Sequence, residues 1–252
     1  MFNKKSVCLA VVLGCASTCV SAVTGSYVGV VGGFNHTKTD VSNVLDYQGI
    51  LNNLDQTVKA DNSKSGASFA GLVGYTYDFG GDFFAGLEVQ FGKNTGDVKS
   101  NKNLVIPNGV FLTSGQIATT VKHSFGVSPL IVLGYKFTES FSGALKIGAN
   151  ISRFSTRTNY SANVGNVIQY QTADSRKTTQ TGFVAGVSGE YAVTDSVSIV
   201  AEGLYTQFGS KKSNLTNPTA FPGAAPQIAQ STHTSSIKPR FITARVGAIY
   251  RF

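Results

Sequence analysis

The last segment of the chain, residues 241–252, alternates between two kinds of side chain. One set of alternate positions is apolar throughout: Ile242, Ala244, Val246, Ala248, Tyr250 and Phe252. The other set mixes apolar, small and charged residues: Phe241, Thr243, Arg245, Gly247, Ile249 and Arg251. Because successive side chains of a strand point to opposite faces, this pattern predicts a strand with one apolar face. An apolar face ending in two aromatic residues is typical of a strand in lipid, where aromatics lie at the membrane–water boundary.

Seven earlier segments show the same two-residue period. They predict strands at 25–34, 66–79, 83–92, 119–137, 141–152, 181–193 and 197–208. The second and third are joined by Gly80-Gly81-Asp82, which predicts a hairpin. In the last of these segments strict alternation is lost after Ala201. Pro129 cannot donate a hydrogen bond to a neighbouring strand, so it predicts a bulge in the fourth segment or different boundaries for it.

The connections between these segments fall into two classes. Three are short turns and four are long, at 35–65, 93–118, 153–180 and 209–238, and the long ones are rich in Asn, Ser, Thr, Lys and Gly. Four long structureless connections would be unusual in a compact soluble domain. An outer-membrane barrel, in contrast, has short periplasmic turns and longer extracellular loops.

We therefore predict an all-β fold, an eight-stranded antiparallel transmembrane β-barrel with short periplasmic turns and four long extracellular loops. Closure pairs every backbone N–H and C=O, which a lipid environment requires. Ten strands are an alternative only if the long loops divide. Their β-prone stretches at 103–113 and 164–172 are interpreted as extracellular extensions of the barrel.

Aromatic residues near the strand ends predict two girdles at the membrane boundaries. The periplasmic girdle would contain Tyr75, Tyr77, Phe79, Phe83, Tyr135, Phe137, Phe141, Tyr191, Tyr250 and Phe252. The outer girdle would contain Phe34, Phe69, Phe91, Phe154, Phe183 and Phe208.

Charged residues within the strands are expected on the inward face. They are Glu88, Lys122, Lys136, Lys146, Glu190, Glu202, Arg245 and Arg251. The interior of an eight-stranded barrel is only wide enough for side chains to fill it, and isolated buried charges are costly. We therefore predict one packed polar network of Glu88, Lys146, Glu190, Glu202 and Arg245. A solid polar plug is the preferred interpretation, and a gated ion path is the alternative.

The first 22 residues have the layout of a secretory signal peptide. A short basic region is followed by an apolar run at residues 7–15, and small residues allow cleavage after Ala22. The apolar run is much shorter than the roughly 20 residues of a membrane-spanning helix. We predict a cleaved signal peptide at 1–22 and a single outer-membrane β-barrel domain at 23–252. An alternative is a lipoprotein acylated at Cys15, which Leu13 fits poorly.

Removal of the signal peptide changes the chemistry of the chain. All three cysteines lie within it, so the mature chain would have neither disulfides nor cysteine chemistry. Without Lys4 and Lys5, 19 basic residues face 13 acidic ones, a net charge of +6.

The excess of basic residues is expected near the outer rim of the barrel, facing lipopolysaccharide phosphates. The rim would contain Arg153, Arg157, Arg176, Lys177, Lys211, Lys212, Lys238 and Arg240. Alternatives are capture of an anionic host polymer, such as a sulfated glycan, and plain solvation. Nucleic acid is not an expected partner, because the basic residues are not clustered with aromatics on a soluble module.

The sequence resembles the opacity-type outer-membrane proteins, eight-stranded surface antigens related in architecture to the OmpA barrel. The resemblance rests on the signal peptide, the opening at 25–33, the eight alternating segments and the ending at 245–252. Val246, Ala248, Tyr250 and Phe252 resemble the C-terminal signal read by the barrel-assembly machinery. The resemblance implies a bacterial outer-membrane location, exposed loops, and roles in envelope integrity and in surface adhesion or immune exposure, without a shared catalytic site. A host surface ligand is a candidate partner. We expect a monomer.

No enzyme, cofactor or metal site is predicted. His123 and Ser124 are adjacent in a strand and so face opposite sides, which prevents a base–nucleophile pair unless a bulge intervenes. Haem ligation is an alternative that no spacing supports, with candidate ligands His36, Tyr47, Tyr160, Tyr170 and His233. A small porin-like channel is the main alternative function, and an outer-membrane lipid-modifying enzyme is a weaker one.

Overall fold

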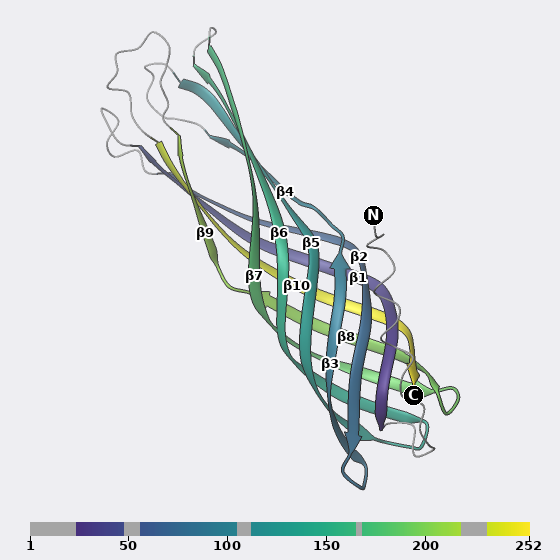
Figure 1. The fold of residues 1–252 in the computed structure, drawn as a ribbon. Helices are drawn as coiled ribbons and strands as arrows, with labels where there is room; N and C mark the ends of the chain where they lie inside the picture. Colours follow the sequence, from purple (N-terminus) through teal and green to yellow (C-terminus); the bar gives the residue numbers. More distant parts are fainter. Residues whose placement is uncertain (1–23, 48–55, 105–111, 165–167, 218–230) are drawn as a thin grey trace, which may run out of the picture.

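A computed structural model describes residues 24–47, 56–104, 112–164, 168–217 and 231–252 (Figure 1). The predicted signal peptide at 1–22 lies outside these residues. The strands are β1 (Gly25–Tyr47), β2 (Gln56–Asp78), β3 (Phe83–Asn94), β4 (Val98–Leu104), β5 (Leu112–Lys136), β6 (Phe141–Val164), β7 (Ile168–Ala192), β8 (Val197–Phe208), β9 (Lys211–Asn217) and β10 (Ser231–Arg251).

The strands form a closed antiparallel barrel of eight. Neighbours pair in the order β1-β2-β3-β5-β6-β7-β8-β10, and β10 pairs back with β1 along its whole length. The strands β4 and β9 are upward continuations of β3 and β8, since β3 and β4 both pair with β5, and β8 and β9 both pair with β10. The predicted fold class is confirmed. Among the described residues, no helix is long and apolar enough to cross a membrane.

The three predicted short turns lie together at one end of the barrel (Figure 1). In the first, Gly80 has a φ of 80°, a left-handed conformation that glycine adopts without steric cost. In the other two, the hydroxyls of Thr138 and Thr194 accept hydrogen bonds from the backbone N–H of Phe141 and Val197, at 2.9 and 3.0 Å. Local polar residues thus fix the tight reversals.

The prediction of long polar loops is wrong for most of their length. Residues 35–47, 56–65, 153–164 and 168–180 continue the strands as paired hairpins. These segments are polar, which is why loops were predicted. A paired strand that is in contact with water needs no fully apolar face, so a polar composition is compatible with strands here. The change in composition therefore marks the end of the apolar outward face rather than the end of the strand.

Above the membrane the barrel wall divides into two sheets. The pairing of β2 with β3 ends at Ser68↔Asn94, and the pairing of β7 with β8 ends at Gly182↔Phe208. Beyond these points, the described pairings join β4, β5, β6 and β7 into one sheet and β2, β1, β10 and β9 into another. The two groups diverge at the upper end of the molecule (Figure 1).

The fourth predicted strand contains an extra residue, but at Ser124 rather than at Pro129. The register between β5 and β6 shifts between His123 and Phe125, whereas it is unchanged across Pro129. The proline interrupts only the local pairing with β6. The shift at Ser124 reverses which residues face inward above it, so Val121 is buried and Lys122 is exposed. The prediction of an inward Lys122 is wrong for this reason.

The outer aromatic girdle differs from its prediction. Phe34, Phe69, Phe91 and Phe183 are exposed on the outer face, together with Phe125. Phe154 and Phe208 are buried inside the barrel, so their assignment to the girdle is wrong. Both occupy inward positions of their strands: Phe154 alternates with the exposed Arg153 on β6, and alternation in β8 continues to its end with Leu204, Thr206 and Phe208 inward.

Two glycines make room for aromatic rings inside the barrel. A Cβ at Gly74 would overlap the ring of Tyr27, and a Cβ at Gly134 would overlap the ring of Phe84. Both rings are buried. The two glycines therefore leave the space beside the wall that these two buried rings occupy.

Candidate functional site: the barrel interior and its outer rim

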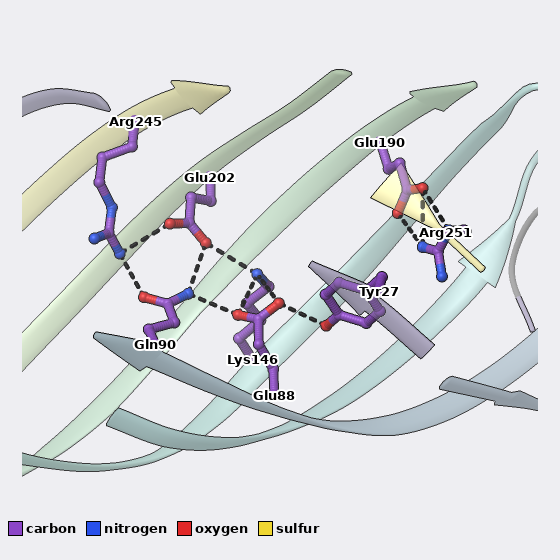
Figure 2. A network of polar contacts seen from close by, with 8 residues as sticks. All are labelled: Tyr27, Glu88, Gln90, Lys146, Glu190, Glu202, Arg245 and Arg251. Carbon is purple, nitrogen blue, oxygen red and sulfur yellow. Dashed lines mark hydrogen bonds and ion pairs between the residues drawn. The ribbon is translucent and has the colours of Figure 1, made fainter. Parts of the chain in front are cut away.

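Four charged side chains meet at the centre of the barrel. Glu88 comes from β3, Lys146 from β6, Glu202 from β8 and Arg245 from β10, each on an inward position of its strand (Figure 2). The Lys146 Nζ lies 2.7 Å from Glu88 Oε1 and 2.9 Å from Glu202 Oε2. Arg245 Nη2 lies 2.8 Å from Glu202 Oε1. We call this group the central network.

The central network is electrically balanced, with two carboxylates and two cations. All four residues are buried, with residue exposures of 3% for Glu88 and Lys146, 5% for Glu202 and 9% for Arg245. A buried charge is tolerated only when it is paired and hydrogen-bonded. The network pairs every charge by drawing on four different strands, while Glu202 Oε1 and Arg245 Nε are buried without a hydrogen bond to another described residue.

Glu190 lies outside the central network, although the sequence grouped them. It pairs with Arg251, whose Nη2 lies 2.7 Å from Glu190 Oε2, near the ends of β7 and β10 where the short turns lie. Figure 2 shows this pair set apart from the central network. Arg251 Nη1 also donates to the Thr76 hydroxyl at 3.0 Å. Lys136, another residue predicted to face inward, pairs with Asp78 at the end where the short turns lie.

Two neutral residues complete the central network. Gln90 donates to Glu88 at 2.7 Å and to Glu202 at 3.0 Å, and accepts from Arg245 at 2.6 Å. The Tyr27 hydroxyl donates to Glu88 Oε2 at 2.7 Å. The inward face of Gln90 was evident from its alternation with Val89, but both faces of the first segment are apolar, so alternation alone could not place Tyr27.

An aromatic layer lies above the central network, toward the long hairpins. It consists of Val121, Phe154, Phe208 and Phe241, with the His123 ring beside them. The His123 ring makes edge contacts with Phe154 and Phe241, both at 5.4 Å between ring centres. We call this group the aromatic layer. The interior is thus crossed first by a polar and then by an apolar barrier.

Small cavities lie on either side of these barriers. One of about 30 Å³ lies between the central network and the Glu190–Arg251 pair, lined also by Tyr27 and Phe84. Another of about 10 Å³ lies above the aromatic layer, beside Thr39 and His123. A water molecule needs roughly 10–15 Å³, so these spaces fit single waters.

His123 makes contacts that suit a structural role. Its Nδ1 accepts a hydrogen bond from the Asn94 backbone N–H at 3.2 Å, and its Nε2 lies 2.9 Å from the Ser152 hydroxyl. Since Nδ1 accepts, the proton of a neutral ring lies on Nε2, which then donates to Ser152. A ring in this tautomer cannot take the serine proton, and Ser152 is 1% exposed. Ser124, the residue next to His123 in the chain, is exposed at the register shift.

The basic residues predicted at the rim occupy several different environments. Arg153, Arg157 and Lys177 are exposed on the outward positions of β6 and β7. Arg176 lies on the alternate positions of β7, opposite Thr156. Arg240 pairs with Asp40 on β1, next to Lys238, which is half-buried. Lys211 is exposed on β9, and the side chain of Lys212 lies outside the described part of the structure.

The four residues of the C-terminal motif share the outward face of β10. Val246, Ala248, Tyr250 and Phe252 are all exposed, in positions that face lipid. Tyr250 and Phe252 form an edge contact with 5.1 Å between ring centres.

No group of three His, Cys, Asp or Glu residues that could hold a metal ion occurs within the described segments. Of the candidate haem ligands, His36 is hydrogen-bonded to Ser65 at 3.1 Å. The side chains of Tyr47, Tyr160, Tyr170 and His233 lie outside the described residues.

Comparison with known proteins decides the family. The model of the outer membrane protein beta-barrel domain matches residues 6–252. The chain belongs to this family. Its location in the bacterial outer membrane follows, as does a lipid environment for the exposed apolar band. A search of the curated proteins found no match.

Solved structures with a similar chain course include three outer-membrane proteins of different kinds. OprG from Pseudomonas aeruginosa is 15% identical, with a TM-score of 0.44, covering 92% of this chain and 98% of that one. Ail, the attachment invasion locus protein of Yersinia pestis, is 13% identical, with a TM-score of 0.27 and coverages of 91% and 99%. The outer membrane protease OmpT from Escherichia coli is 12% identical, with a TM-score of 0.36 and coverages of 93% and 99%.

Proposed function

We propose that this outer-membrane barrel is a non-conducting anchor that supports the cell envelope and displays long hairpins for adhesion or ligand binding. The observation that carries the proposal is the doubly closed interior. An ion crossing the barrel would have to separate Lys146 from its two carboxylates and then pass the aromatic layer. Buried pairs of this kind cost several kcal/mol to break, on the order of 3–5.

The hairpins have the reach that a surface-binding role requires. Above its exposed outward residue Ile151, β6 continues from Arg153 to Val164. At about 3.3 Å per residue these 12 residues extend the strand by about 40 Å. The polar outer parts of β6 and β7 are therefore carried well beyond the lipid headgroups, where they can meet another surface.

Single-channel conductance of the refolded protein in planar bilayers tests the closed interior. The wild-type barrel is expected to give no steady open steps. The triple variant Phe154→Ala/Phe208→Ala/Phe241→Ala removes the rings of the aromatic layer and keeps the central network. If the central network alone blocks ions, this variant should also give no open steps. Reproducible steps from the wild-type protein would overturn the proposal and identify a small channel.

A shortened hairpin tests the surface role. Because Arg157 pairs with Ser175, an Asn-Gly turn can join these residues directly and remove 158–174 in register. Cells displaying the shortened barrel should lose adhesion to host cells that full-length barrels support. In a matched variant the β1–β2 hairpin is shortened by joining Lys38 to Ser63. If only the first variant loses adhesion, the β6–β7 hairpin carries the binding surface; if both lose it, adhesion depends on the length of the hairpins in general. Unchanged adhesion in both variants would contradict the role.

Two partners follow from this proposal. The outward motif of β10, ending in Tyr250 and Phe252, is proposed as the signal for the barrel-assembly machinery. Phe252→Ala should then slow insertion in cells while leaving refolding in detergent unchanged. The basic rim is proposed to contact the anionic headgroups of the outer leaflet, mainly lipopolysaccharide. The proposed form is a monomer, in which the charges of the central network pair within one chain.

A further inference from the structure

Four basic side chains surround Ser155 on the outer surface of the barrel. Arg153 and Arg157 lie two residues before and after it on β6, on the same outward face. Lys122 of β5 and Lys177 of β7 are its direct cross-strand partners on either side. Cross-strand Cβ atoms lie about 5 Å apart, and i±2 positions about 7 Å apart. The four cations therefore form a ring with a hydroxyl at its centre, which we call the Ser155 ring.

The Ser155 ring exists because of the extra residue at Ser124. Without the register shift there, Lys122 would point into the barrel and a different residue would lie opposite Ser155. The shift moves Lys122 to the outer face, where its side chain is 59% exposed. The bulge thus positions a charge at this surface, in the way bulges commonly redirect side chains.

The charge of the Ser155 ring is largely uncompensated. Lys122 forms an ion pair with Asp97 at 2.8 Å. Arg153, Arg157 and Lys177 make no ion pair within the described part of the chain. Lys99 of β4, opposite Thr120 in the row of Arg157, adds a further exposed cation. Like charges so close together are unfavourable unless an anion joins them.

The position of the ring indicates what that anion belongs to. Arg153 lies directly beside Phe125, and Ile151 and Phe183 lie just below, all exposed on the lipid-facing surface. A molecule held here would place its charged group among the cations and apolar chains along the band beneath. This combination fits a phosphorylated lipid of the outer leaflet better than a soluble polymer, which would leave the apolar residues without a partner.

We infer that the Ser155 ring is a binding site for a phosphate group on the headgroup of an outer-leaflet glycolipid. The inference rests on the proposed contact between the basic rim and anionic lipid, and assigns that contact to one place. Arginines would hold the phosphate oxygens through paired N–H groups, the lysines would add charge, and Ser155 would donate its hydroxyl.

Binding of bisphosphorylated lipid A to the refolded barrel in detergent micelles, followed by native mass spectrometry, tests the site. Arg153→Gln/Arg157→Gln should weaken binding roughly 10- to 30-fold, at about 1 kcal/mol per cation near a membrane surface. The matched control Lys38→Gln/Lys238→Gln removes two cations from the outward face of β1 and β10 and should change binding less than twofold. Heat-modifiable gel mobility verifies folding of each variant.

A second variant tests the centre of the ring. Ser155→Glu places a carboxylate among the four cations and should weaken lipid A binding at least as much as the double arginine variant. Ser155→Ala removes only one hydrogen bond and should weaken it a few-fold. Equal binding by all these variants would overturn the site.

Other outcomes separate the site from its alternatives. If the control variant loses as much lipid A binding as the double arginine variant, lipid contacts the basic rim in general and the Ser155 ring is overturned. If neither double variant loses binding, both the basic rim and the Ser155 ring are contradicted. Undiminished binding of fully dephosphorylated lipid A would overturn phosphate recognition. Displacement of lipid A by inorganic phosphate or by heparin at low concentration would instead identify a site for soluble anions. None of these outcomes bears on whether the barrel conducts.

Discussion

The central network and the Ser155 ring each gather four charged side chains, the network from β3, β6, β8 and β10 across the interior and the ring from the adjacent strands β5, β6 and β7, yet they are built in opposite ways. The network balances two cations against two carboxylates, and all four side chains are buried. The ring places four cations around one hydroxyl and has a single described acid, Asp97, at its edge. Burial makes balance necessary, because an unpaired charge inside the barrel would cost several kcal/mol. At the surface water tolerates an imbalance, which leaves charge available for a partner.

Removal of the central ammonium should produce the largest effect. Lys146→Met leaves Glu88 and Glu202 buried without the cation between them, and should lower the free energy of unfolding by about 3–5 kcal/mol. Urea unfolding in detergent micelles, followed by far-ultraviolet circular dichroism, measures the change. Adding Glu88→Gln should recover part of the loss, since it removes one unpaired carboxylate. A loss below about 1 kcal/mol for the single variant would show that the network is open to water.

The aromatic layer provides an apolar comparison within the same interior. Phe208→Ala should lower the free energy of unfolding by about 3 kcal/mol, because the ring is 1% exposed and its removal leaves a cavity. The matched variant Phe34→Ala removes a ring of equal size from the outer face, where the residue is 76% exposed, and should cost less. The difference between the two variants, measured in the same micelles, isolates packing inside the barrel. If Phe208→Ala and Phe34→Ala lower the free energy of unfolding equally, the aromatic layer is loosely packed.

One neutral contact to the network should have an intermediate effect. Tyr27→Phe removes the hydroxyl that donates to Glu88 but keeps the buried ring. A hydrogen bond to a charged group contributes about 1.5–3 kcal/mol, so the variant should lose about that much stability. Tyr75→Phe, an exposed tyrosine on the lipid-facing surface, serves as the control and should be nearly neutral. If Tyr27→Phe is equally neutral, then Glu88 does not depend on this donor.

The smallest effect is expected for the ion pair at the Ser155 ring. Asp97→Asn breaks the pair with Lys122, but both side chains are exposed to solvent, so stability should change by less than about 1 kcal/mol. Binding of lipid A should increase, because the ring loses its one described acid. Stability is measured by urea unfolding, and lipid A binding by titration at two salt concentrations. The increase in binding should shrink at the higher salt concentration, because screening weakens the attraction between the cations and the lipid phosphate. A large loss of stability without a change in binding would show that the Asp97–Lys122 pair supports the fold, as the central network does, and does not modulate a binding site.

The alternation of apolar residues was enough to predict eight strands, the closed barrel, the three short turns and most of the lipid-facing surface. It was also enough to place Glu88, Glu202 and Arg245 on inward positions. A strand in lipid has one face that must be apolar, so its pattern is strong and local. Where the hairpins leave the membrane this requirement ends, and the same sequence no longer distinguishes strands from loops.

Three features depended on the tertiary structure. The choice of Arg251 rather than Lys146 as the partner of Glu190 depends on the heights that these residues occupy on three separate strands, β7, β10 and β6. The extra residue at Ser124 is visible only as a shift between two paired strands, and it decides that Lys122 faces outward. The Ser155 ring then depends on that shift, because alternation fixes the face of each residue within one strand, whereas register between strands fixes which residues become neighbours.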